Sequence, residues 1–372
     1  MGSRSAGRPG RSRTAPLNAQ VNSPRSRLST GRGGARACGA LLREVPLHSL
    51  LRRSSSMAQH ADVVVVGGGV VGLTTAIALN EAGLRTVVWT AEVPRQTTSA
   101  VAGALLGGPV MTEPRDDAVR WQKTGLEIFD ELATHPHSGV TAARGRLVTR
   151  MDGGTPPWAR DLPGFAECSP DELAGFKAGF WITSPIADMP CYLDYLVDRL
   201  CRSGGDIEIC TVASLEQPTS HAPIVVNCAG VAGGTLACDD SVTPVRGQHV
   251  VVENPGLTEF FYEGGADDDW TGFFPHGDRV VLGGNARKGD WNLEPDEAQT
   301  ADILRRCAEV EPRLADAPVI KVDVGLRPGR PSIRLEEQQV DEGRLIHNYG
   351  HGGVGVSMSW GCALDVVKLA SA

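Results

Sequence analysis

Three glycines follow a run of valines at the spacing that a phosphate-binding turn needs. Gly67, Gly69 and Gly72 fit the pattern G-x-G-x-x-G, and an acid, Glu92, stands 20 residues beyond Gly72. The first glycine permits a tight turn, the second permits close approach of the backbone to a pyrophosphate, and the third permits close packing of a helix on a strand. These residues therefore predict a site for a dinucleotide.

Hydrophobic periodicity predicts the elements that position this turn. The stretch "ADVVVVGGGVVGLTTAIALNEAGLRTVVWTAE" indicates a strand over 63–66, a helix over 70–82 and a second strand over 86–89. The helix opens at Val70 and Val71, where unpaired N–H groups face the phosphates. Glu92 is the expected ribose ligand, with Thr90 or the Ala91 backbone as alternatives. The motif by itself does not choose between NAD and FAD.

The next segment favours FAD. "RQTTSAVAGALLGG", residues 95–108, is small and hydroxylated where an NAD enzyme would normally start another amphipathic helix. Small residues permit a flat ring or a phosphate to lie against the backbone, although a plain glycine and alanine loop has the same composition. Near the end of the chain a strand over 345–348 enters "YGHGGVG" and a helix over 357–369, which is a second glycine-rich helix N-terminus.

The remaining pattern divides the chain into two predicted domains. A helix over 190–203 and strands over 207–212 and 224–227 return to the nucleotide-binding sheet. We expect 57–108, 190–235 and 325–372 to form the discontinuous dinucleotide domain. The excursions 109–189 and 236–324, the later one with alternating strands and a helix over 298–310, form the substrate domain.

The distribution of charged residues indicates which classes of partner the protein can bind. Residues 1–56 hold 11 arginines and one acid, and the remainder holds 25 basic and 43 acidic residues. An acidic body repels nucleic acid and anionic lipid, so we expect a small-molecule partner. The segment 1–56 is predicted to be disordered; it is either a transit peptide or an extension upstream of a natural start at Met57. No run of 18 apolar residues occurs.

The nine cysteines form no C-x-x-C pair and no metal-ligand spacing, so no metal site is expected. An odd, scattered set of this kind indicates a reducing compartment, and we expect a cytoplasmic protein.

Several longer stretches carry a family resemblance. "LIHNYGHGGVGVSMSWGCA", "GLRPGRPSIRLE", "VVNCAGV", "RGQHVVV" and "LGGNARKGDWNLEPD" occur in the order that is typical of the D-amino-acid oxidase family. From Met57 to its end the chain is similar to this family, which includes the D-aspartate oxidases. The resemblance implies an α/β fold with a Rossmann-like FAD-binding domain of the glutathione-reductase type and a second α+β substrate domain built on an antiparallel sheet. It also implies oxidation of D-amino acids by hydride transfer to the flavin with O2 as acceptor, giving a 2-oxo acid, ammonia and H2O2.

The resemblance assigns roles to individual positions. Arg327 is expected to bind the substrate carboxylate and to lie beside the flavin, because a guanidinium matches a carboxylate with two parallel hydrogen bonds. Arg330, three residues later, is the alternative. The other expected positions are Gly67, Gly69, Val70, Val71, Gly72, Glu92, Thr97, Thr98, Gly103, Val212, Gly352, Gly353, Gly355, Val356 and Ser357 for the cofactor, with Gly353 also facing the substrate. No acid or base catalyst is expected.

One position departs from the family pattern. Where the family has a tyrosine that binds the same carboxylate, the strand "WTGFFPHG" has Gly272 or Phe273. Tyr262 in the preceding strand is the expected replacement. Arg287 and Lys288 form either a cationic wall for acidic substrates or a solvated turn.

Two other readings stay open: a sarcosine-type or amine-type flavin oxidase of the same fold, and a flavin-binding protein without catalysis. A homodimer is also expected.

Overall fold

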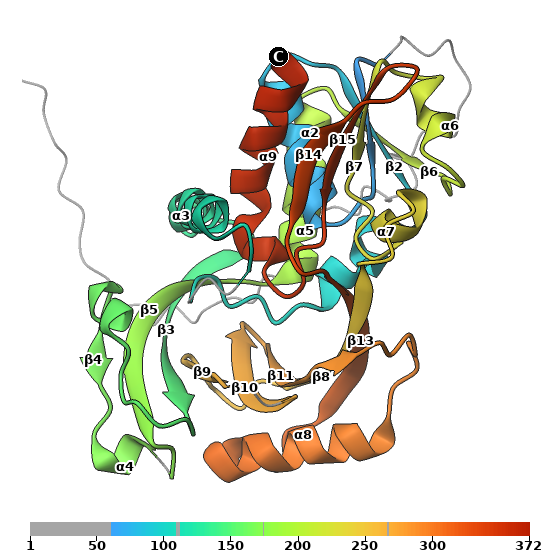
Figure 1. Ribbon diagram of the computed structural model, residues 1–372. Helices are drawn as coiled ribbons and strands as arrows, with labels where there is room; N and C mark the ends of the chain where they lie inside the picture. The colour runs from blue at the N-terminus through green and yellow to red at the C-terminus, as the bar shows by residue number, and fades with distance from the viewer. Residues whose placement is uncertain (1–60, 109–111, 174, 266–267) are drawn as a thin grey trace, which may run out of the picture. The chain divides into compact units, whose positions relative to one another are not determined.

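The computed structural model describes residues 61–108, 112–173, 175–265 and 268–372, which all belong to one unit of the chain (Figure 1). The segment 1–56 lies outside the described residues. The strands within the described part form two sheets.

The first sheet is mainly parallel and carries the glycine motif. Its strand order is β14-β15-β7-β1-β2-β6, with β14 antiparallel to β15 and the other pairs parallel. The strands are β1 (Val63–Val66), β2 (Thr86–Thr90), β6 (Asp206–Ile209), β7 (Ile224–Asn227), β14 (Arg334–Gln338) and β15 (Arg344–Tyr349). The run of four valines in β1 is buried on both faces, as expected of a central parallel strand.

Helices cover this sheet. They are α2 (Val70–Glu81), α5 (Met189–Arg202), α6 (Glu216–Thr219), α7 (Ala232–Leu236) and α9 (Gly355–Ser371). The helix α3 (Arg115–Leu132) packs on α9 and contacts β3 and β5. Figure 1 shows α2, α5 and α9 together beside one face of the sheet. Val63 and Val65 pack with these helices, whereas Val64 and Val66 pack on the other side with Leu215. The turns η1 (Pro94–Gln96) and η2 (Thr98–Val101) follow β2.

The second sheet is mainly antiparallel. Its order is β12-β8-β11-β10-β9-β3-β5-β4, β13 also pairs with β8, and the β3–β9 pair is parallel. The strands are β3 (Val140–Thr149), β4 (Ala166–Glu167), β5 (Ala178–Ala187), β8 (Thr243–Glu253), β9 (Phe260–Glu263), β10 (Asp269–His276), β11 (Arg279–Asn285), β12 (Arg287–Lys288) and β13 (Val319–Gly329). The helix α8 (Glu297–Val310) packs on β8, β10 and β11 (Figure 1). The short elements η3 (Pro157–Asp161), α4 (Pro170–Leu173) and η4 (Pro312–Leu314) complete the described part.

The α/β architecture with a parallel sheet and a second, mostly antiparallel sheet agrees with the prediction. Most predicted elements lie within two residues of their observed bounds, but the strand expected over 207–212 ends at Ile209. Residues 210–212 leave the strand and line the cavity described below. The strand β13 pairs with β8 from Val319 to Gly329, so it runs across the predicted domain boundary between 324 and 325.

Every helix in the described ranges is too short or too polar to span a lipid bilayer.

Candidate functional site

A cavity of about 620 Å³ opens at the carboxyl ends of β1, β2 and β7. Ligands of parallel α/β sheets bind at this edge, and the volume lies within the roughly 300–1,000 Å³ of small-molecule and cofactor sites. Residues of β8 and β13 also line the cavity, among them Gly247, His249 and Arg327. Both sheets therefore contribute to one site.

The glycine turn forms one wall. Gly67 has φ +114°, and a Cβ there would lie 2.5 Å from the Cys228 carbonyl oxygen. A Cβ on Gly72 would lie 1.8 Å from the Gly67 oxygen, and one on Gly69 would lie 3.0 Å from Ser99 Oγ. The first two glycines let strand, turn and helix pack closely, whereas Gly69 keeps the mouth of the turn open. Ser99 Oγ accepts a hydrogen bond from the Val70 N–H at 3.0 Å.

The outer end of the cavity is formed after β2 and β6. Glu92 lines the cavity there, and Thr90 Oγ1 donates to the Glu92 carbonyl oxygen at 2.8 Å. Val212 lies in the same wall. This wall has the acid and the apolar surface that a ribose and an adenine need.

The N-terminus of α9 supplies a second wall. Gly352, Gly353, Gly355 and Val356 all line the cavity, and Gly352 has φ +53°. A glycine in this left-handed conformation lets the chain turn from β15 into α9, so that the first N–H groups of the helix face the cavity.

Most predicted site residues line this cavity, and four do not. Those that do are Gly67, Gly69, Val70, Val71, Glu92, Thr97, Thr98, Val212, Arg327, Gly352, Gly353, Gly355 and Val356. The exceptions are Gly72, Gly103, Tyr262 and Ser357.

Packing explains three of these exceptions, and Tyr262 is described below. Gly72 packs against the Gly67 carbonyl, and a Cβ on Gly103 would meet the Phe274 ring at 2.9 Å. The Ser357 carbonyl is so close to Gly125 of α3 that a Cβ there would stand 2.0 Å from it.

Arg327 is the one lysine or arginine among the residues that line the cavity in the described part of the chain. Its Nη1 donates to the Asn285 carbonyl oxygen at 3.1 Å, and none of the ion pairs between described residues includes it. Burial lowers the pKa of this guanidinium, which still keeps its charge because an arginine is not deprotonated in proteins. A buried cation without a carboxylate partner is costly, and a substrate carboxylate would offset that cost.

Arg330, the alternative, lies in a different setting. Its Nε donates to an Asp239 carboxylate oxygen at 2.9 Å, and its Nη1 donates to the Ser332 carbonyl oxygen at 2.8 Å. Arg330 is therefore paired with a carboxylate already, whereas Arg327 has no carboxylate partner among the described residues, so the geometry favours Arg327 as the carboxylate ligand.

His249 was not predicted. Its Nδ1–H donates to the Val101 carbonyl oxygen at 2.8 Å, since a carbonyl only accepts. Its Nε2 therefore carries a lone pair, and this buried atom has no partner among the described residues. Burial, together with the nearby charge of Arg327, lowers the pKa of His249 to about 4, so the ring is neutral near pH 7. The only sequence signal was the histidine in "RGQHVVV".

Tyr262 lies beyond the Arg327 end of the cavity. Burial raises the pKa of its hydroxyl, and Arg327 is the charged group that acts most strongly on it. The hydroxyl has no hydrogen-bond partner among the described residues. Tyr262 therefore stays protonated near pH 7, and its hydroxyl can donate a hydrogen bond.

The indole of Trp270 lies against Tyr262 and His249, with ring centroids 5.3 and 6.0 Å apart. Arg287, in contrast, donates to both carboxylate oxygens of Asp269, at 2.7 and 2.8 Å, and Lys288 is exposed. The positive charge of Arg287 is thus compensated.

These features fit the predicted FAD. The glycines form a cradle that a Cβ would fill, two helix N-termini face the cavity, and buried acceptors such as His249 Nε2 and Asn348 Oδ1 lack protein partners in the described part.

Comparison with known proteins agrees with this geometry. Residues 62–369 match the family model described as FAD dependent oxidoreductase. A protein of Rubrobacter xylanophilus named D-amino-acid oxidase is 44% identical over 315 residues, which is 84% of this chain and 96% of that protein. A Streptomyces coelicolor protein of the same name is 44% identical, over 83% of this chain and 97% of its own. The human protein named D-aspartate oxidase is 34% identical, over 84% of this chain and 95% of its own.

Solved structures show the same fold. The glycine oxidase of Geobacillus kaustophilus superposes with a TM-score of 0.70 at 19% identity, covering 84% of this chain and 95% of that one.

Proposed function

We propose, because the chain belongs to the FAD-dependent oxidoreductase family, that it is a D-amino-acid oxidase. The observation that carries this assignment is Arg327, a buried guanidinium without a carboxylate partner in the described part of the chain, at the inner end of the dinucleotide cavity. The relatives named D-amino-acid oxidase, at 44% identity over more than four fifths of the chain, support it.

The chain's own residues hold the cofactor. The turn at Gly67 and Gly69 and the N-terminus of α2 take the pyrophosphate, and Glu92 takes the ribose. Gly353 and Gly355 at the start of α9 take the ring system. When bound, FAD supplies the acceptor for the hydride that leaves the substrate Cα, and the electrons then reduce O2.

Arg327 orients the substrate. Its guanidinium binds the α-carboxylate with two parallel hydrogen bonds, and the Tyr262 hydroxyl donates a third. Because His249 is neutral near pH 7, it does not add a second positive charge beside Arg327. Fixing the carboxylate fixes Cα, and this orientation is the main contribution of the protein to the rate.

The reaction balances without a further reactant. The amino acid loses its Cα hydrogen with two electrons and one N–H proton, which gives an imino acid. O2 takes up two electrons and two protons and leaves as H2O2. Water then hydrolyses the imino acid to a 2-oxo acid and ammonia.

A panel of D-amino and L-amino acids, including D-aspartate, tests this function. We expect peroxide release with D-amino acids and not with their L-enantiomers, and loss of the flavin absorbance when a D-amino acid is added without oxygen. A yellow protein that no D-amino acid bleaches would contradict the proposal.

Two further assignments concern the location and the assembly of the protein. We also propose that the protein is cytoplasmic, from its odd and scattered cysteines, and that it forms a homodimer. Fractionation and gel filtration check these assignments.

A further inference from the structure

The indole of Trp270 lies over three glycines. A Cβ on Gly272, Gly283 or Gly284 would each lie 2.6 Å from an indole carbon. Only glycine at these positions leaves room for the ring where it lies. The surface of β10 and β11 at these three glycines is therefore covered by one large side chain from a neighbouring position.

An irregularity in the sheet puts the ring there. Asp269 of β10 pairs with Asn285 of β11, but Gly272 pairs with Gly283, so two residues of β10 face the single residue Gly284. An extra residue of this kind bends the strand and removes ladder partners from nearby backbone groups. Those groups must be satisfied by other partners if they are buried.

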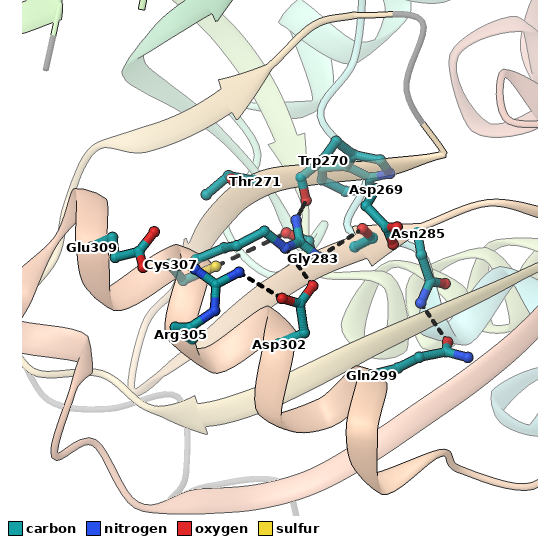
Figure 2. A network of polar contacts seen from close by, with 12 residues as sticks. Asp269, Trp270, Thr271, Gly283, Asn285, Gln299, Asp302, Arg305, Cys307 and Glu309 are labelled. Carbon is teal, nitrogen blue, oxygen red and sulfur yellow. Dashed lines mark hydrogen bonds and ion pairs between the residues drawn. The ribbon is translucent and has the colours of Figure 1, made fainter. Parts of the chain in front are cut away.

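Arg306 of α8 supplies these partners. Its Nη1 donates to the Trp270 carbonyl, its Nη2 donates to the Gly284 carbonyl at 3.3 Å, and its Nε is paired with Asp302 at 2.8 Å. The Arg306 side chain is only 14% exposed. Figure 2 shows Asp302 and Arg305 on α8 beneath the strand that carries Trp270. One guanidinium thus ties both strands of the irregular pair to α8.

A second contact acts on the same irregularity. The Thr271 N–H donates to a Glu263 carboxylate oxygen at 3.1 Å, and Glu263 pairs with Arg150 at 2.7 Å. The backbone of the bulge is therefore held at its carbonyls by Arg306 and at one N–H by Glu263, which leaves Trp270 little freedom to move.

The Trp270 ring does not itself line the cavity, but it lies against two residues that are close to Arg327. Trp270 contacts His249, which lines the cavity, and Tyr262. The charge of Arg327 acts on the pKa of the Tyr262 hydroxyl, so these two residues are close to each other. In a D-amino acid the side chain is attached to the carbon that carries the carboxylate. When Arg327 binds the carboxylate, the side chain is therefore close to His249, Tyr262 and the Trp270 ring. The indole of Trp270 fills the volume above Gly272 and Gly283, so a substrate side chain cannot occupy it.

We propose that Trp270 limits the size of the substrate side chain, and that Arg306 is the positioning residue which holds Trp270 in place. This inference rests on the proposed function, because it places the substrate carboxylate at Arg327. It specifies the substrate class as D-amino acids with small side chains.

Binding of inert carboxylates tests the size limit without turnover. The flavin-loaded enzyme is titrated with acetate and with phenylacetate, which share a carboxylate and differ in bulk, and the change in flavin absorbance gives each Kd. In Trp270→Ala the affinity for phenylacetate relative to acetate should rise by about tenfold or more, the usual effect of pocket size on an apolar ligand. Trp270→Phe should give a smaller rise. An unchanged ratio in Trp270→Ala, or a ratio that moves toward acetate, overturns the size limit.

Arg305 provides the matched control for Arg306. It is the adjacent residue of α8 and also pairs with Asp302, at 2.7 Å, but it makes no contact with Trp270. We expect Arg306→Ala to shift the phenylacetate-to-acetate ratio in the same direction as Trp270→Ala, and Arg306→Lys to restore part of it. Arg305→Ala should leave the ratio unchanged.

The near-ultraviolet circular dichroism of the same variants reports the indole itself. The signal that Trp270→Phe removes should weaken in Arg306→Ala and persist in Arg305→Ala. Equal ratios and equal spectra in the Arg306 and Arg305 variants overturn the positioning role. If Arg306→Ala does not fold, Arg306→Lys provides the same comparison.

Turnover then separates this inference from the proposed function. Wild type should oxidise D-alanine with a higher kcat/KM than D-phenylalanine, and Trp270→Ala should narrow that difference. If no D-amino acid is oxidised but the carboxylate ratios shift as expected, the proposed function fails and the size limit stands. If D-amino acids are oxidised and the ratios do not shift, the size limit fails alone.

Discussion

The guanidinium of Arg327 lies over Gly247, so closely that a Cβ on Gly247 would stand 2.3 Å from Nη1. The contact joins adjacent strands, since β13 pairs with β8 along its length. A glycine inside a strand usually weakens the sheet, and it often marks a place where another group approaches the backbone closely. Here that group is the guanidinium of the proposed carboxylate ligand, and both Gly247 and Arg327 line the cavity.

Removal of the guanidinium should impair both substrate binding and reaction. We expect Arg327→Ala to lower kcat/KM by about two to four decades, because truncating one partner of a buried charge pair costs about 3 to 5 kcal/mol. Arg327→Lys should recover only part, since an ammonium cannot make two parallel hydrogen bonds. Steady-state kinetics with a D-amino acid measure both variants.

Arg330→Ala is the control for this experiment. It removes a guanidinium that is already bound to Asp239, so it should lower stability more than kcat/KM. Flavin content must stay near wild type in all three proteins. If Arg327→Ala keeps kcat/KM within about threefold while Arg330→Ala abolishes it, the assignment of the two arginines is wrong.

A methyl group on Gly247 should displace Arg327 without removing it. Gly247→Ala places Cβ within 2.6 Å of three guanidinium atoms, so the side chain must shift by more than a few tenths of an ångström. We expect KM for the D-amino acid to rise, by less than in Arg327→Ala, with flavin content unchanged. A Gly247→Ala enzyme with wild-type KM would show that the observed position of Arg327 is not the binding position.

The cofactor cradle can be tested at Gly69. A Cβ there already meets Ser99 Oγ at 3.0 Å, and the larger Val side chain would fill the pyrophosphate approach. Gly69→Val should therefore purify without yellow colour. Gly265→Val adds the same side chain at an exposed glycine with nothing within 4 Å of its Cβ, and it should stay yellow. Absorbance per mole of protein measures both, and a yellow Gly69→Val protein contradicts the cradle.

The Tyr262 hydroxyl should contribute one hydrogen bond to the substrate carboxylate. Its loss in Tyr262→Phe is worth about 1.5 to 3 kcal/mol, the usual range for a hydrogen bond to a charged group. We expect kcat/KM to fall by one to two decades, mainly through KM, with stability close to wild type. If the kinetics are unchanged, Tyr262 does not replace the tyrosine that the family pattern has at Gly272 or Phe273.

The part of the site that depends on local sequence was predictable. The turn at Gly67 and the start of α2 at Val70 agree with the prediction, because strand, turn and helix are contiguous and the glycine spacing reports their geometry. The glycines before α9 lie at the cavity for the same reason.

Features built from several strands were not predictable. Trp270 occupies the space left by glycines of two different strands, and the extra residue that places it there depends on the pairing of β10 with β11. Nor does the sequence indicate that Arg306, 36 residues away on α8, donates to the Trp270 carbonyl. Register and bulges are set by tertiary packing, and no local pattern in the strand records them.

The last prediction concerns acid stability. His351 is buried beside the start of α9, its Nε2 has no partner among the described residues, and burial lowers its pKa from 6.5 to about 4. An unfolded chain binds a proton at this residue once the pH falls below about 6.5, whereas the folded protein does not until about pH 4. The unfolded state thus holds more protons in this window, so the free energy of unfolding falls as the pH is lowered through it.

His351→Asn removes this titration. Each such group contributes at most about 1.4 kcal/mol per pH unit, so the variant should lose less stability than wild type between pH 6.5 and 4, even if its stability at pH 7 is lower. Thermal unfolding of both proteins at several pH values measures the two slopes. FAD is kept in constant excess so that cofactor linkage does not vary.

His249, His276 and His347 also have pKa values lowered to about 4 by burial, so the stability of the variant should still depend on pH. Parallel curves for His351→Asn and wild type would show that His351 is already protonated in the folded protein within this window.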